Sequence, residues 1–151
     1  MIVFYAKGQQ RLLGKNIISA EFSKWGKYSA LSYTANIDHI VAQKGSFSYY
    51  GRLGGGIWAP SMSVNGMLFL PKFNLGFGAL LGKRSHHFDV QAGPEIYLYT
   101  GSNLPDGHIK SIDLHVYALA GYRYQKLGHP FMFRVAIATY GKACVALGYS
   151  F

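Results

Sequence analysis

Residues 143–151 read ACVALGYSF, and the alternation in this stretch decides the fold of the chain. Taken in steps of two, one row is apolar and consists of Ala143, Val145, Leu147, Tyr149 and Phe151. The residues between them are all small. Successive side chains of an extended strand point to opposite faces, so the stretch predicts a β-strand with one apolar face and one face of small residues.

The composition of the 151 residues indicates a single domain that carries few charges. Only 14% of the residues are charged, compared with about 25% in an average soluble domain. Every apolar stretch is interrupted before it reaches the roughly 18 residues that a membrane-spanning helix needs, so such a helix is excluded and a membrane β-barrel is not. The single cysteine, Cys144, has no partner for an internal disulfide and is interpreted as a small buried residue.

From Asn16 onward the chain divides into alternating segments, which clusters of Gly, Lys, Pro, Asn and Asp separate. The eight segments cover residues 16–24, 27–38, 45–58, 66–82, 87–99, 110–125, 131–140 and 143–151. Since none of them has a helical period, the sequence predicts an all-β fold. Eight consecutive strands of this kind favour an antiparallel up-and-down barrel. The long fourth segment and Pro94 within the fifth predict a bulge or an extension there.

The two faces of these segments differ in charge, and this difference predicts which face looks outward. The apolar rows of six segments carry no charged residue. The opposite rows combine small polar residues with nearly balanced charges, which suits a cramped interior better than a surface in water. A Lys or Arg on the lipid face costs about 2–4 kcal/mol at mid-depth, so an uncharged row favours contact with lipid. The predicted outer side chains are Phe73, Leu75, Phe77, Leu114, Val116, Phe133, Val135, Leu147 and Tyr149.

The charged residues of the inward rows predict an ion-pair network in the barrel lumen. Its predicted members are Glu21, Asp38, Arg52, Lys72, Asp89, Glu95, Asp113, Arg123 and Arg134. Asp89 and Arg123 should meet on neighbouring strands, with Arg134 and Asp38 at the same level. An eight-stranded barrel is filled by its side chains, and bulk is expected from Tyr50, Tyr97, Tyr117, Leu119 and Met132. We therefore predict no general diffusion pore.

Four stretches resemble the small outer-membrane β-barrel proteins common in Bacteroidetes, many of which have no known activity. These stretches are LLGKRSHHFDVQAGPEIYL at 80–98, GYRYQ at 121–125, FMFRVA at 131–136 and LGYSF at 147–151. The resemblance covers residues 16–151 and implies a porin-like, transmembrane β-strand protein of the Gram-negative cell outer membrane. It implies contact with outer-membrane lipid and, during biogenesis, with the barrel assembly machinery. Leu147, Tyr149 and Phe151 are similar to the C-terminal signal which that machinery recognises; alternatively, Phe151 is only a residue of the aromatic girdle.

The segments outside the strands carry further expectations. Residues 1–15 form a leader, interpreted either as the remnant of a signal peptide or as an N-terminal arm. The loops near 59–65 and 100–109 are expected to be external and are candidates for contact with an unidentified protein partner. The net charge of +9 does not predict nucleic-acid binding, because nine of the ten lysines lie in the leader or at segment ends. We interpret these lysines as interfacial anchors.

Two alternatives to a structural or interaction role stay open at this point. Lipid A deacylases and acyltransferases also use eight-stranded barrels, and His108, Ser111, Asp113 and His115 are imaginable catalytic residues. We do not expect an enzyme, because the motifs of these families are absent. A soluble up-and-down barrel that binds an apolar ligand is the other alternative, and it needs the apolar rows inside. We expect no cofactor and no metal site, since the adjacent His86 and His87 point to opposite faces.

The interpretation of the C-terminal row leads to a first prediction. Deleting Phe151 should reduce insertion into the outer membrane of cells more than it reduces folding into detergent micelles. The reason is that only the cellular route depends on recognition by the assembly machinery. Fractionation of cells, compared with refolding yield in micelles, measures the two effects. An equal loss in both assays would mean that Phe151 acts only through packing.

Overall fold

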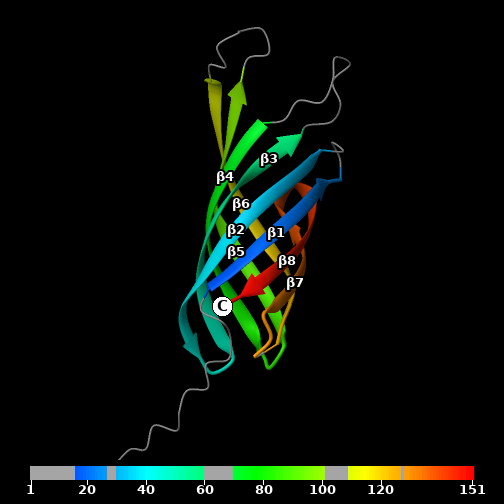
Figure 1. Cartoon of the computed structure of the whole chain (residues 1–151). Coiled ribbons are helices and arrows are strands. Elements are labelled where there is room, and N and C mark those ends of the chain that lie inside the picture. The colour runs from blue at the N-terminus through cyan, green and yellow to red at the C-terminus, as the bar shows by residue number, and fades with distance from the viewer. Residues whose placement is uncertain (1–15, 27–29, 60–69, 101–108, 127) are drawn as a thin grey trace, which may run out of the picture.

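A computed structural model describes residues 16–26, 30–59, 70–100, 109–126 and 128–151, which form one closed β-barrel (Figure 1). Its eight strands are β1 (Asn16–Trp25), β2 (Leu31–Lys44), β3 (Phe47–Ala59), β4 (Leu70–Lys83), β5 (His86–Thr100), β6 (Ile109–Gln125), β7 (Phe131–Ala138) and β8 (Lys142–Ser150). Each strand pairs antiparallel with the next, and β8 pairs with β1. The predicted eight-stranded up-and-down barrel is confirmed. The leader predicted at 1–15 lies outside the described residues.

The helical content of the described residues is a single turn, η1 (Thr139–Gly141), between β7 and β8. Tyr140 in this turn has a positive φ of 64°, so the strand predicted to reach residue 140 ends two residues earlier. Within the part of the chain that the structure describes, no helix is long and apolar enough to cross a membrane.

The strands differ in length, and this makes one wall of the barrel taller than the other. β7 has 8 residues and β8 has 9, whereas β5 has 15 and β6 has 17. β6 pairs with β5 over almost its whole length, but with β7 only over residues 119–125. The upper part of β6 therefore rises above the end of β7 (Figure 1).

Two irregularities differ from the predicted strand boundaries. β2 continues to Lys44 past the predicted end at residue 38, because Val41 forms a bulge between Ile40 and Ala42. Pro94 pairs with Val116 of β6, while the pairing with β4 is interrupted between the Asn74–Glu95 and Phe77–Ala92 pairs. The missing donor of proline explains the interruption. The predicted irregularity in the fifth strand thus takes two forms, an interrupted ladder with β4 and a register shift between Tyr99 and Thr100 in the pairing with β6.

The outer surface of the barrel is apolar, as the alternation predicted. Of the nine side chains predicted on this surface, eight are exposed, among them Phe77 at 71% and Val116 at 70%, and Phe133 is half-buried. The aromatic and aliphatic rows therefore look away from the lumen on β4, β6, β7 and β8. This arrangement contradicts the soluble-barrel alternative, which needs the same rows inside.

Inward glycines of β3 and β4 make room for the large side chains that fill the lumen. A Cβ atom on Gly78 would lie 2.3 Å from the ring of Tyr50. Gly76 faces Tyr117 and Gln91 in the same way, and Gly54 faces two asparagine side chains. The predicted bulky residues Tyr50, Tyr97, Tyr117, Leu119 and Met132 are all buried. Gly54, Gly76 and Gly78 thus leave room for inward side chains, several of which belong to the neighbouring strand.

This matching predicts that Gly78→Ala destabilises the barrel. The added methyl group would displace Tyr50, which is buried, and overpacking of this kind costs about 1–3 kcal/mol. The urea midpoint of the refolded barrel measures the effect. Gly51→Ala is the matched control, because a Cβ atom at Gly51 meets nothing within 4 Å. Equal midpoints for the two variants would contradict the packing role of Gly78.

Candidate functional site in the barrel lumen

The lumen is closed near the turn end by an apolar plug. The plug consists of Ile17, Ile40, Tyr50, Leu80 and Met132, which contact one another and are all buried. These residues come from β1, β2, β3, β4 and β7, so side chains from around the barrel meet at its centre. These five buried side chains occupy the lumen at this level.

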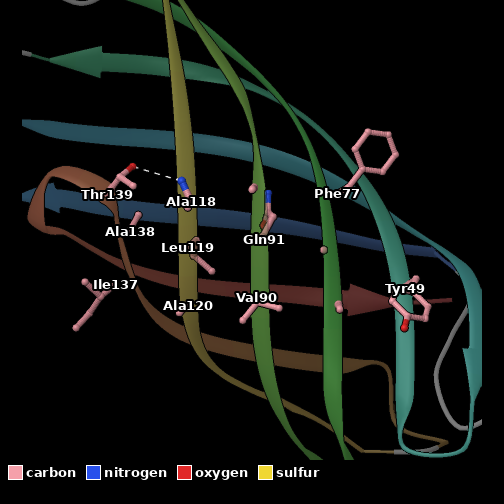
Figure 2. Close-up of a pocket in the computed structure, with 13 residues that line it drawn as sticks. Tyr49, Phe77, Val90, Gln91, Ala118, Leu119, Ala120, Ile137, Ala138 and Thr139 are labelled. Atoms are coloured by element: carbon pink, nitrogen blue, oxygen red, sulfur yellow. Dashed lines mark hydrogen bonds between the residues drawn. The ribbon is translucent and has the colours of Figure 1, made fainter.

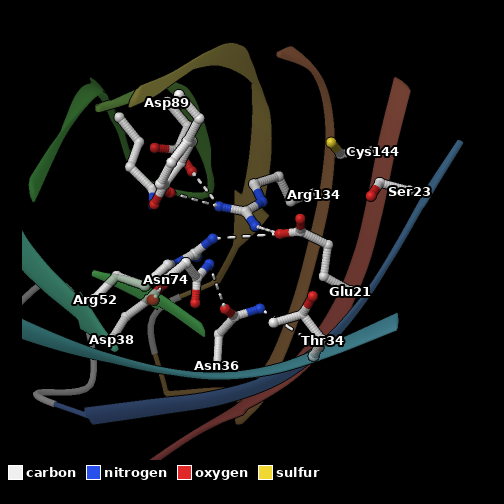
Figure 3. A network of polar contacts seen from close by, with 12 residues as sticks. Glu21, Ser23, Thr34, Asn36, Asp38, Arg52, Asn74, Asp89, Arg134 and Cys144 are labelled. Atoms are coloured by element: carbon white, nitrogen blue, oxygen red, sulfur yellow. Dashed lines mark hydrogen bonds and ion pairs between the residues drawn. The ribbon is translucent and has the colours of Figure 1, made fainter. Parts of the chain in front are cut away.

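A network of three arginines and three carboxylates lies next to the plug (Figure 3). Asp38 of β2 accepts two hydrogen bonds from Arg52 of β3, from Nε at 2.6 Å and from Nη2 at 2.8 Å. This paired geometry is the strongest arrangement of an arginine and a carboxylate. Arg123 of β6 reaches the same carboxylate with Nη1 at 3.2 Å. Both charges of the central pair are fully buried.

Asp89 of β5 and Glu21 of β1 complete this network. Asp89 lies 3.8 Å from Arg123 and 3.6 Å from Arg134, and it accepts a 2.6 Å hydrogen bond from the Tyr50 hydroxyl. Glu21 contacts Arg134 and lies 3.4 Å from Arg52. The structure therefore brings together the predicted pair of Asp89 and Arg123, with Asp38 and Arg134 at the same level. Three positive and three negative side chains balance, which limits the cost of burying them.

A second, smaller cluster lies further toward the loop end. Glu95 of β5 accepts hydrogen bonds from Lys72 of β4 at 2.7 Å, from Lys142 of β8 at 3.0 Å and from the Tyr97 hydroxyl at 2.6 Å. Lys142 also lies over the ring of Trp25, with Nζ 4.9 Å from the ring centre. Between the two clusters, Asn74 donates a hydrogen bond to Asn36. Contacts between side chains of different strands thus occupy the lumen at several levels.

Lys142 is a lumen residue that the sequence analysis missed. It was interpreted as an interfacial anchor because it stands at a strand end, but the structure buries it against Glu95. The signal was present in the sequence, since Lys142 belongs to the same row as Cys144 and Ala146, which both point inward. The helical turn at 139–141 separates this residue from β7.

Asp113 was predicted in the lumen network, and this prediction is wrong. Its side chain is 57% exposed, and its carboxylate lies 3.5 Å from His115 of the same strand. The reason is the unequal strand length, because β6 has no paired neighbour on the β7 side above Leu119. The inward row of β6 therefore faces open space at this height. The other eight predicted members of the network all take part in ion pairs inside the barrel.

The remaining candidate residues lie apart from the lumen clusters. Leu147, Tyr149 and Phe151 are exposed on the outer surface, which suits both a recognition signal and a girdle. His87 is buried, and His86 is exposed with its ring 2.6 Å from the Tyr122 hydroxyl. Within the described residues, no three His, Cys, Asp or Glu side chains are grouped to hold a metal ion. The loops predicted near 59–65 and 100–109 fall almost entirely outside the described ranges, as does His108.

Comparison with solved structures places the fold among barrels of the outer membrane. The N-terminal β-barrel domain of Pseudomonas aeruginosa OprF superimposes with a TM-score of 0.64 at 16% identity, over 92% of this chain and 99% of that one. The Yersinia pestis outer membrane protein Ail, solved in a phospholipid bilayer nanodisc, gives a TM-score of 0.56 at 12% identity, over 91% and 99% of the two chains. No protein-family model and no curated protein matches the sequence. At these identities the likeness establishes a shared fold.

The arginine network predicts coupling between Asp89 and Arg123. Arg123→Leu leaves Asp38 and Asp89 short of a cation and should destabilise the refolded barrel by about 3–5 kcal/mol. Asp89→Leu in the same chain removes the surplus negative charge and should recover part of this loss. The urea midpoints of the two single variants and the double variant measure the coupling.

The control pairs Arg123→Leu with Glu95→Leu. Glu95 belongs to the separate lysine cluster, so the two losses should add. If the stability losses of Asp89→Leu and Arg123→Leu also simply add in the double variant, the two residues do not share a network.

Proposed function

We propose that this chain is an integral outer-membrane β-barrel with a side-chain-filled lumen, and that its role is structural or one of interaction rather than that of a general pore. One observation carries the proposal: the barrel is apolar outside and charged inside. A barrel in water has the opposite arrangement, because charged side chains are stabilised by water and apolar side chains by burial. If lipid hydrocarbon surrounds the barrel, both the apolar outer face and the charged inner face are explained.

The dimensions of the barrel support this surrounding. A strand that crosses a bilayer at a tilt needs about 9–11 residues, and seven of the eight strands have at least 9, while β7 has 8. The outer wall has a shallow hollow of about 630 Å³ over β4 to β7, between the larger side chains of Tyr49, Phe77 and Ile137 (Figure 2). Small apolar residues such as Ala79, Ala92 and Ala120 line it. Acyl chains, which are flexible, would fill such a hollow.

The filled lumen supports a role other than general diffusion. A solute would have to displace the apolar plug and separate arginine–carboxylate pairs that no water reaches. Breaking one such buried pair costs several kcal/mol. The ion pairs join strands on opposite sides of the lumen, so they hold the barrel in one register and present the external loops on a rigid support.

Catalysis has weaker support in the geometry. Asp113 contacts His115, as an acid and a base on one row can. Among the described residues, Ser111 forms no hydrogen bond with Asp113 or His115. We therefore keep a lipid A-modifying activity outside the proposal. The resemblance to barrels of Bacteroidetes and the contact with the assembly machinery stay predictions.

The proposal predicts how the chain behaves in membranes. Expressed in a Gram-negative host with an export signal, it should resist alkaline extraction and be released by detergent, and its unboiled form should migrate faster than its boiled form. Val135→Arg, on the outer face, should lose membrane insertion, because a charge at mid-depth costs about 2–4 kcal/mol.

Ser111→Arg is the matched control, since Ser111 is exposed on the tall part of β6 beyond the wall formed by β7. It should insert like the parent chain. Release of the parent chain by alkaline buffer alone would refute an integral membrane barrel. Recovery of Val135→Arg as a folded protein in the soluble fraction would refute it as well.

A further inference from the structure

The end of the barrel that carries the short turns is a continuous rim. Backbone hydrogen bonds join neighbouring turns, from Gly82 N to Ser46 O at 2.9 Å and from Gln125 N to Ser85 O at 2.9 Å. Ser150 N bonds to Pro130 O, which links the β6–β7 turn to β8. The three turns between β2 and β3, β4 and β5, and β6 and β7 therefore lie side by side at one end (Figure 1).

This rim collects positive charge. Lys44, Arg84 and Lys126 are exposed, one on each turn, together with His129. Among the described residues, the carboxylates closest to it along the strands, Asp38 and Asp89, are fully buried inside the barrel. No Asp or Glu side chain of the described residues is therefore exposed at this rim beside the basic side chains. An anionic partner is the chemistry that complements such a rim.

One place on the rim is hollowed. A recess of about 290 Å³ lies at the β6–β7 turn and is lined by Lys126, Gly128, His129, Pro130, Tyr149 and Ser150. Lys126 supplies a cation and His129 a ring nitrogen, while Ser150 supplies a hydroxyl that accepts a hydrogen bond from Gln125. These groups are donors suited to the oxygen atoms of a phosphate.

The same recess borders the apolar outer face. The rings of Tyr149 and Phe151 lie 6.5 Å apart, centre to centre, and both are exposed beside it. Phe131, at the start of β7, is exposed as well. A cationic recess directly next to aromatic rings on a lipid-facing wall matches a molecule with an anionic head and apolar chains, in that order. A free anion or a nucleic acid would use the charges but not the rings.

We propose that the recess at the β6–β7 turn, with Lys126, His129 and the neighbouring Arg84, binds the phosphate headgroup of an anionic phospholipid. The inference rests on the proposed membrane location and adds the lipid class and the place of contact. Aromatic rings hold the glycerol region, and the basic rim favours lipids with net negative charge over zwitterionic ones. Basic residues at a membrane surface each strengthen binding to anionic lipid by about five-fold.

The test measures the preference of the refolded full chain for spin-labelled phosphatidylglycerol over spin-labelled phosphatidylcholine in phosphatidylcholine vesicles. The parent barrel should prefer phosphatidylglycerol, and high salt should weaken this preference. Lys126→Gln alone should reduce the preference for phosphatidylglycerol. The triple variant Arg84→Gln, Lys126→Gln and His129→Gln should bind the two labelled lipids almost equally. Lys24→Gln is the matched control, because Lys24 is exposed on β1 toward the opposite end of the barrel.

Several outcomes would overturn the inference while the proposed function stands. These are a folded parent barrel without any preference, an unchanged preference in Lys126→Gln and the triple variant, or an equal loss in Lys24→Gln, which would indicate net charge alone. Full displacement of the labelled lipid by inorganic phosphate at constant ionic strength would assign the recess to free phosphate instead. A parent chain that does not fold in the phosphatidylcholine vesicles would refute the proposed function itself.

Discussion

Closure of the sheet between β1 and β8 is the constraint on which the rest of the structure depends. Nine residue pairs, from Ile17–Ser150 to Trp25–Lys142, join the first strand to the last, so every strand has one face toward a common lumen and one face away from it. A slip of one residue would turn every side chain of a strand to the wrong face. Closure therefore converts a simple alternation into an inside that is charged and an outside that is apolar.

The balance of charge inside the barrel follows from this constraint. A lumen of eight strands is narrow, so a charged side chain that points inward must meet charges from the opposite wall. Arg52, Arg123 and Arg134 each contact carboxylates on other strands. The Glu95 cluster does the same with two lysines. Glycines on β3 and β4 provide the space for these side chains. The same inward rows therefore supply both the close packing and the ion pairs of the lumen.

The two ends of the barrel have different characters because the strands end at different heights. Short turns at one end hold backbone hydrogen bonds to each other and expose basic side chains. At the other end β5 and β6 rise above β7, and the inward row of β6 carries Asp113 and His115 into the open. Between these ends, the lumen holds the apolar plug and the two clusters of buried ion pairs.

Alternation in the sequence alone determined the fold class, the number of strands, the outer rows and eight members of the lumen network. These properties follow from local periodicity, which needs no knowledge of neighbouring strands. Only the tertiary structure decided the fate of Asp113, because the exposure of this side chain depends on where β7 ends. It also decided which carboxylate each arginine contacts and which turns lie side by side, since strand register and unequal length arise from pairing between distant segments of the chain.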